Sequence, residues 1–140
     1  MKNAESMSGP EVGHALSGFG INLLVRDSQR TAIFLEQILG FQRLRLDKDY
    51  GLFQHRDNTY QIHSDGTYWN HPLLGLMPEN GLRGLGVELR LYDVPPDETE
   101  AKAVAGGYEV LQQSADKPHG LRECYLLDPD GYCWVPSIKI

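Results

Sequence analysis

The chain has 140 residues, of which 41% are hydrophobic and 23% are charged, a composition typical of one globular domain. The 13 Lys and Arg residues against 19 Asp and Glu residues exclude the basic field of a nucleic-acid-binding protein. No apolar run reaches the roughly 18 residues of a membrane span, and the first residues contain no apolar segment of a secretory signal. Two cysteines are too few for a disulfide scaffold. We therefore expect a cytoplasmic domain without nucleic-acid or membrane partners.

Residues 1–17 combine small and polar side chains without an apolar period, so we interpret them as a flexible N-terminal arm. The pattern changes at residue 18. Apolar residues alternate with other residues over 19–25, which predicts a strand with one apolar face. Asp27 then offers a helix N-cap, and Gly40 offers the end of that helix.

Three further strands are predicted after this helix, over residues 41–46, 50–55 and 59–64. Residues 65–83 then form a long connector that contains Gly, Pro, Trp69 and other apolar residues. Connectors of this length are uncommon within a small domain and are often functional. This connector either covers a groove or a partner's surface, or fills the edge of the domain's own core.

The second half of the chain repeats the first. Apolar residues alternate over 85–91, a helix is predicted over 95–105, and strands follow over 108–112, 121–127 and 132–138. Asp93 corresponds to Asp27, and Gly107 corresponds to Gly40. This correspondence indicates an internal duplication of a strand-helix-strand-strand-strand unit.

Four motifs carry a family resemblance: residues 21–27 (INLLVRD), 39–41 (LGF), 107–108 (GY) and 121–134, which contains a DPDGY turn. In this order they resemble the vicinal-oxygen-chelate superfamily, which includes glyoxalase I, extradiol dioxygenases and the bleomycin- and fosfomycin-resistance proteins. The resemblance implies an α+β fold with two tandem βαβββ modules, residues 18–64 and 84–138, in a single domain over 18–138. It also implies an eight-stranded curved sheet, forming an open-barrel cup, and usually a homodimer.

The resemblance places the usual metal ligands of this superfamily at positions that cannot bind a metal ion here. Those positions hold Gly20, Gly86 and Val135, none of which has a donor side chain. Gln61 and His63 are the remaining possible donors, on the fourth predicted strand. A divalent ion needs several oxygen or nitrogen ligands. We therefore expect no cofactor.

Side-chain alternation along the strands predicts which residues face the cup. A three-residue loop over 129–131 pairs Tyr125 with Val135, and a shift of one residue would reverse the faces. In this register Cys124 and Trp134 face the helix. The ligand-binding candidates are Asn22, Gln61, His63, Glu88, Arg90, Glu123 and Tyr125 on the strands, His119 at the rim and Trp69 on the connector.

Several of these candidates also have structural interpretations. His63 is a proton acceptor, a metal ligand or an ordinary surface histidine. Glu88 and Arg90 share a face of one strand, so they form either a structural ion pair or a pair that orients a ligand. Tyr125 either stacks against a planar ligand or belongs to the core.

The sequence thus predicts a metal-independent protein that binds a small molecule, such as an antibiotic or an aromatic metabolite. The alternative is a glyoxalase-like lyase or a metal-dependent dioxygenase, in which His63, Glu88 and Glu123 hold a displaced divalent metal ion. A third possibility is a scaffold or dimerisation module, with the cup filled by its own side chains. The fold alone does not separate these functions, because function depends on the site.

Overall fold

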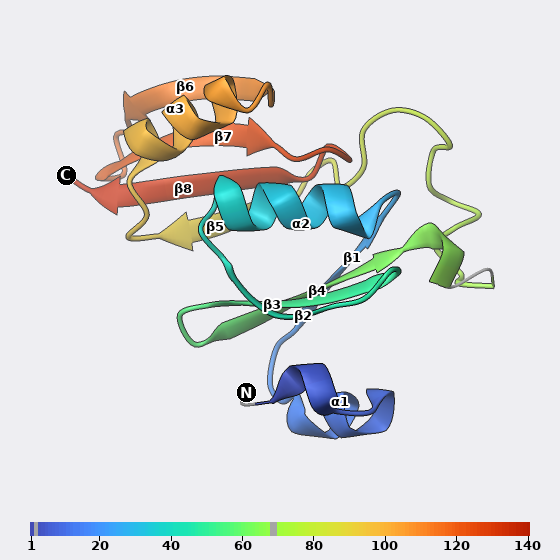
Figure 1. Ribbon diagram of the computed structural model, residues 1–140. Coiled ribbons are helices and arrows are strands. Elements are labelled where there is room, and N and C mark those ends of the chain that lie inside the picture. The colour runs from blue at the N-terminus through green and yellow to red at the C-terminus, as the bar shows by residue number, and fades with distance from the viewer. Residues whose placement is uncertain (2, 68–69) are drawn as a thin grey trace. The chain divides into compact units, whose positions relative to one another are not determined.

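The computed structural model describes residues 1, 3–67 and 70–140 (Figure 1). Trp69, a predicted ligand-binding residue, lies outside these residues. The chain divides into two compact units, Met1–Leu76 and Met77–Ile140. Within the described residues, no helix has the length and apolar character that a membrane crossing requires.

The first unit contains a βαβββ module, as predicted. Its strands are β1 (Ile21–Val25), β2 (Gln42–Leu46), β3 (Tyr50–His55) and β4 (Asn58–Ser64), in the order β1-β4-β3-β2. β1 and β4 are parallel, and the other neighbours are antiparallel. α2 (Ser28–Gln37) follows β1, and its predicted N-cap, Asp27, accepts hydrogen bonds from the backbone N–H groups of Gln29 and Arg30. Gly40 follows the helix with a φ of 72°, the left-handed conformation of a glycine that ends a helix.

The segment predicted as a flexible arm instead contains η1 (Ala4–Ser6) and α1 (Gly9–Ala15). Ser8 and Glu11 form a capping box at the start of α1. Ala4 and Val12 are buried in a cluster with Leu52 of β3. At seven residues, α1 is too short to be a stable helix by itself, so it depends on this tertiary packing. The few apolar residues of the segment did not reveal that packing. Figure 1 shows α1 and α2 on opposite sides of the first sheet.

The second unit repeats the same topology. Its elements are β5 (Glu88–Tyr92), α3 (Pro96–Ala105), β6 (Val110–Asp116), β7 (Leu121–Leu127) and β8 (Cys133–Lys139), and its strand order is β5-β8-β7-β6. α3 packs against β6, β7 and β8. The expected eight strands are therefore present as two four-stranded sheets, one in each unit, and the predicted duplication is confirmed.

The start of β5 differs from the prediction. Alternation predicted a strand from residue 85, but β5 begins at Glu88. Gly84 and Gly86 have φ values of 69° and 88°, which an extended strand does not use. As a consequence, Leu85 is 73% exposed and Val87 is 56% exposed instead of facing the core.

The predicted register of β7 and β8 is confirmed. Leu126 pairs with Trp134 and Glu123 pairs with Ser137, which is the register that a Tyr125–Val135 pair requires. The Asp128 carboxylate fixes the intervening turn. One of its oxygens accepts hydrogen bonds from three consecutive backbone N–H groups, those of residues 130–132. Its other oxygen accepts a hydrogen bond of 3.1 Å from the indole Nε1 of Trp134.

Asp128→Asn is expected to lower the free energy of unfolding by about 2 kcal/mol at pH 4.5. The side-chain NH₂ group of Asn would take the place of an acceptor oxygen and would face an N–H donor. Burial raises the pKa of Asp128 to about 6. The folded state therefore retains this proton longer than the unfolded state, and the stability it confers is lost as the pH rises from about 4 through about 6. Urea unfolding of both proteins at pH 4.5 and pH 7 tests this, with the larger difference expected at pH 4.5. An equal difference at both values would contradict the titration of Asp128.

Candidate functional site

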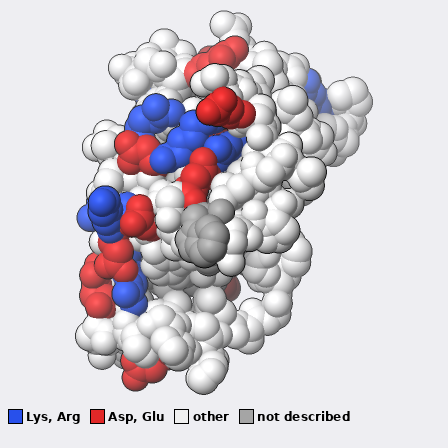
Figure 2. Space-filling view, turned by 90° about the vertical axis from the view of Figure 1, so that its right-hand side faces the viewer, with Lys and Arg blue, Asp and Glu red and all other residues white. Residues whose placement is uncertain are grey.

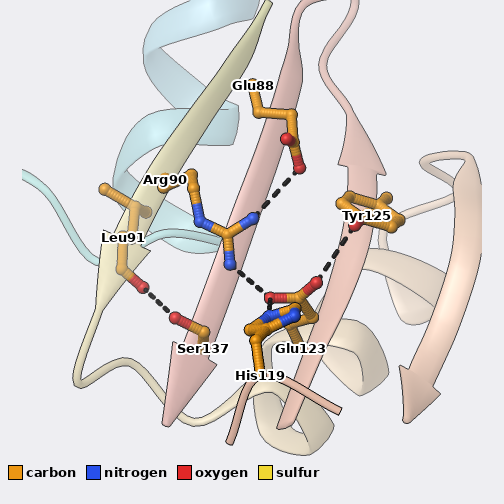
Figure 3. A network of polar contacts seen from close by, with 7 residues as sticks. All are labelled: Glu88, Arg90, Leu91, His119, Glu123, Tyr125 and Ser137. Atoms are coloured by element: carbon orange, nitrogen blue, oxygen red, sulfur yellow. Dashed lines mark hydrogen bonds and ion pairs between the residues drawn. The ribbon is translucent and has the colours of Figure 1, made fainter. Parts of the chain in front are cut away.

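Five of the predicted site residues form one polar network in the second unit (Figure 3). The guanidinium of Arg90 lies between two carboxylates. Its Nη1 donates to Glu88 Oε1 at 3.1 Å, and its Nη2 donates to Glu123 Oε2. His119 Nε2 lies 3.2 Å from the same Glu123 oxygen, and the Tyr125 hydroxyl donates to Glu123 Oε1 at 3.0 Å.

The strand register brings these residues together. Glu88 and Arg90 lie on one face of β5, while Glu123 and Tyr125 lie on one face of β7. β8 separates the two strands in the sheet. Arg90 is opposite Val135 of β8, and its long side chain extends over this strand to Glu123 (Figure 3). The turn that precedes β7 supplies His119.

Glu123 is the central acceptor of the network, and only 1% of its surface is exposed. Burial disfavours its charged form, but the hydrogen bonds from Arg90, His119 and Tyr125 outweigh burial and lower its pKa. The pKa of Tyr125 is raised, first by burial and then by its bond to Glu123. At neutral pH the network therefore holds an ionised Glu123, whose charge Arg90 balances, and a protonated phenol.

A groove of ≈ 510 Å³ lies beside this network. Glu88 and Tyr125 line it and also belong to the network, so the groove has a polar end. The rest of its wall is mostly apolar and is formed by Leu82, Leu85, Val87, Leu111, Leu127 and Cys133, together with three glycines. This wall was not predicted, because the alternation over 85–91 placed Leu85 and Val87 on the core face of a strand. The two glycines at 84 and 86 were the available signal.

The positions of the usual metal ligands do not fit a metal ion. Gly20 and Gly86 have no side chain, and Val135 is apolar and fully buried. The side-chain oxygen of Gln61 accepts a hydrogen bond from the Tyr50 hydroxyl at 3.0 Å.

The displaced site that the sequence allowed has a similar difficulty. A cation already lies between Glu88 and Glu123, because the Arg90 guanidinium bonds to both carboxylates. In the described part of the chain, no three His, Cys, Asp or Glu side chains are grouped to hold a metal ion. These donor sets therefore do not match what a divalent ion needs.

The other three predicted strand residues cluster in the first unit. His63 Nδ1 lies 2.7 Å from Asn22 Oδ1, and Gln61 accepts its bond from Tyr50. The rings of Tyr50 and His63 have centroids 4.7 Å apart. His63 is buried, which rules out an ordinary surface histidine, and burial together with the nearby His71 lowers its pKa. His63 is thus neutral at neutral pH.

The predicted site residues accordingly fall into two clusters, one in each unit, and their roles in binding stay predictions. The sequence did not indicate Lys117, whose Nζ lies 5.8 Å from the centroid of the Tyr125 ring. Nor did it indicate Arg45, which donates to the backbone oxygen of Met7, far away in the sequence.

Charges of both signs are interleaved on the face drawn in Figure 2, where Lys and Arg lie beside Asp and Glu. Arg43 pairs with Glu36 at 2.7 Å, and Arg122 pairs with Asp97 at 2.7 Å. Such pairing reduces the positive potential that attracts a phosphate backbone. The expectation that nucleic acid does not bind rests on this pairing and on the net charge.

Comparison with solved structures identifies the fold. The chain is similar to a glyoxalase-related enzyme from Fulvimarina pelagi, with 18% identity, 89% of each chain covered and a TM-score of 0.70. It is also similar to a glyoxalase/bleomycin resistance protein/dioxygenase family enzyme from Burkholderia phytofirmans PsJN, with 16% identity, 86% of this chain and 96% of that chain covered and a TM-score of 0.72. A lactoylglutathione lyase from Agrobacterium tumefaciens aligns at 18% identity over 89% of this chain and 95% of that chain, with a TM-score of 0.63.

No protein-family model and no curated protein matches the sequence. At identities below 20%, the structural likeness shows the fold and not the activity. The chain therefore has the vicinal-oxygen-chelate fold that the sequence motifs indicated.

Proposed function

We propose that this chain binds a small organic molecule in the groove of its second unit and needs no metal ion to do so. One observation carries the proposal: an apolar groove of ≈ 510 Å³ ends at a network of charged and hydroxyl groups. Apolar pockets with a few converging polar groups, of about 300–1,000 Å³, are the usual form of small-molecule sites.

The residues have distinct roles in this proposal. The leucines and Val87 contact the apolar body of the ligand, and the ring of Tyr125 offers a surface for a planar group. Glu88, whose side chain is about half exposed, binds a polar group of the ligand. Glu123 is a positioning residue, since it is buried and holds Arg90 and Tyr125 in place.

The positive charge of Arg90 supports binding without a metal ion. Arg90 supplies the positive charge that the two carboxylates require, so ligand binding needs no added cation. The glyoxalase-like and dioxygenase alternatives require a set of metal ligands, and the described residues do not supply one. The small-molecule ligand, the homodimer and the cytoplasmic location remain proposals, based on the site or on the family resemblance.

The test is a thermal-shift screen of planar aromatic antibiotics and aromatic metabolites, followed by calorimetric titration of each compound that raises the melting temperature. Leu111→Glu places a charge in the groove at a residue that is already 60% exposed. We expect it to weaken binding at least about tenfold, because a desolvated charge disfavours an apolar ligand.

The matched control is Val104→Glu on α3, at a residue that is 62% exposed and does not line the groove. It should leave the dissociation constant unchanged. Ligands that bind wild type and Leu111→Glu equally would show that the groove is not the site. A screen without any stabilising compound would also count against the proposal.

A further inference from the structure

The first unit contains a pocket that the proposed function does not use. It has a volume of ≈ 410 Å³ and lies between α1 and the sheet. α1 contributes Gly9, Val12 and Gly13, and the sheet side contributes Arg45, Asp47, Tyr50, Gln61 and His63. The pocket is therefore bounded by the N-terminal segment on one side and by a polar sheet face on the other.

Two kinds of contact hold the N-terminal segment over this face. Val12 packs with Ala4 and Leu52 in a buried cluster. Arg45 Nη1 donates to the backbone oxygen of Met7 at 2.5 Å, and its Nε donates to Asp47 Oδ2 at 2.8 Å. Arg45 thus connects the helical segment to the sheet, and the pocket is a built feature of the first unit.

The sheet side of the pocket presents hydrogen-bond donors beside one carboxylate, that of Asp47. The oxygen of the Gln61 side chain already accepts from Tyr50, so Gln61 offers its amide Nε2. Arg45 uses Nε and Nη1 in the bonds above and offers Nη2, which bonds to no residue in the described ranges 1, 3–67 and 70–140. The rings of Tyr50 and His63, whose planes are tilted by 50°, add a partly apolar wall.

The helix side of the pocket has no side chains at two of its positions. Gly9 and Gly13 are one turn apart on α1, and a Cβ atom built on either would meet open space. A side chain at position 13 would therefore begin in free volume that belongs to the pocket.

We propose that this pocket is a binding site for a small molecule with a planar body and an acceptor oxygen, in the form of a carboxylate or a carboxamide. The oxygen accepts hydrogen bonds from Gln61 and Arg45, and the planar body lies against Tyr50 and the backbone of α1. Arg45 and Asp47 form an ion pair, so the pocket does not require a charged ligand. The feature that a carboxylate and a carboxamide share is the acceptor oxygen.

The test uses benzoate, benzamide and benzylamine as probes in titrations followed by NMR of the isotope-labelled chain. Benzoate and benzamide should shift the side-chain amide signal of Gln61 and the Nε signal of Arg45, with dissociation constants of about 1 mM or tighter. Benzylamine has the same ring and a donor group in place of the acceptor, and it can pair with the Asp47 carboxylate but not accept from Gln61, so it should leave the side-chain amide signal of Gln61 unshifted. A tenfold preference for benzoate over benzamide would show recognition of charge, and equal binding would show recognition of the oxygen alone.

Gly13→Leu fills the pocket and should weaken benzoate binding at least about tenfold. His14→Leu is the matched control, because His14 is the exposed neighbour on α1 and does not line the pocket. Gln61→Leu removes one donor and should weaken benzoate binding without depending on the behaviour of α1.

Two results would overturn the proposal: no shift of the Gln61 and Arg45 signals by benzoate or benzamide, or equal binding by Gly13→Leu and wild type. Leu111→Glu separates this site from the groove of the second unit, since it should not change benzoate binding here. Failure of one site therefore leaves the other testable.

Discussion

Arg90→Met is expected to lower the free energy of unfolding by about 3 kcal/mol at pH 7, because it leaves the buried Glu123 carboxylate without its cation. Glu123 is 1% exposed, so water cannot replace the lost guanidinium. Glu88 loses its partner as well, but its exposed carboxylate remains hydrated. Urea unfolding monitored by circular dichroism measures the change.

The pH dependence of this loss identifies its cause. In wild type the pKa of Glu123 is lowered, so its stabilising contribution is present above its unfolded pKa and is lost as the pH falls through the folded value. In Arg90→Met the carboxylate stays buried without its guanidinium, so its pKa rises and protonation at low pH relieves the penalty. The difference from wild type should therefore shrink between pH 7 and pH 4.

Arg122→Met is the matched control for this variant. Arg122 lies next to Glu123 in the sequence and bonds to Asp97 and Asp116, whose side chains are mostly exposed. Exposed ion pairs contribute about 0–1 kcal/mol. If both arginine variants lose the same stability, the buried network does not stabilise the second unit.

Gly84→Ala is expected to lower the free energy of unfolding by about 3 kcal/mol, for two reasons that act together. Gly84 has a φ of 69°, which strains a residue with a side chain. A Cβ at this position would also overlap the ring of Tyr132. Since Gly84 lines the groove, the adjustment of the chain should also change the groove's wall.

Gly86→Ala separates the two effects. Gly86 has a φ of 88°, but a Cβ there meets open space, so only the backbone strain of about 1 kcal/mol applies. Thermal or urea unfolding of both variants gives the comparison. Equal losses would mean that the close packing of Gly84 on Tyr132 carries no energy.

Features set by local chemistry could be predicted from the sequence. Asp27 caps α2 as expected, and the turn at Asp128 produced the β7–β8 register from which the positions of Glu123 and Tyr125 followed. Alternation also placed Glu88 and Arg90 on one face of β5. The network could be predicted to this extent because strand periodicity and turn length determine which side chains share a face.

Features set by tertiary contacts could not be predicted. The order of α1 depends on packing against Leu52, and the partner of Arg45 is a backbone oxygen of that same segment. Leu85 and Val87 continued the alternation of β5, so nothing in their pattern distinguished groove residues from core residues. The neighbouring glycines at 84 and 86, which have positive φ values in the structure, were the one signal that separates the two.

We propose that Arg90, and not a metal ion, balances Glu88 and Glu123 at the end of the groove. Elemental analysis by inductively coupled plasma mass spectrometry tests this most directly, on the protein as purified and after dialysis against zinc, nickel, manganese and iron. We expect less than about a tenth of an ion per chain in every case, because a site of this composition lacks the necessary donors. One ion per chain in wild type, lost in Glu88→Ala, would contradict it.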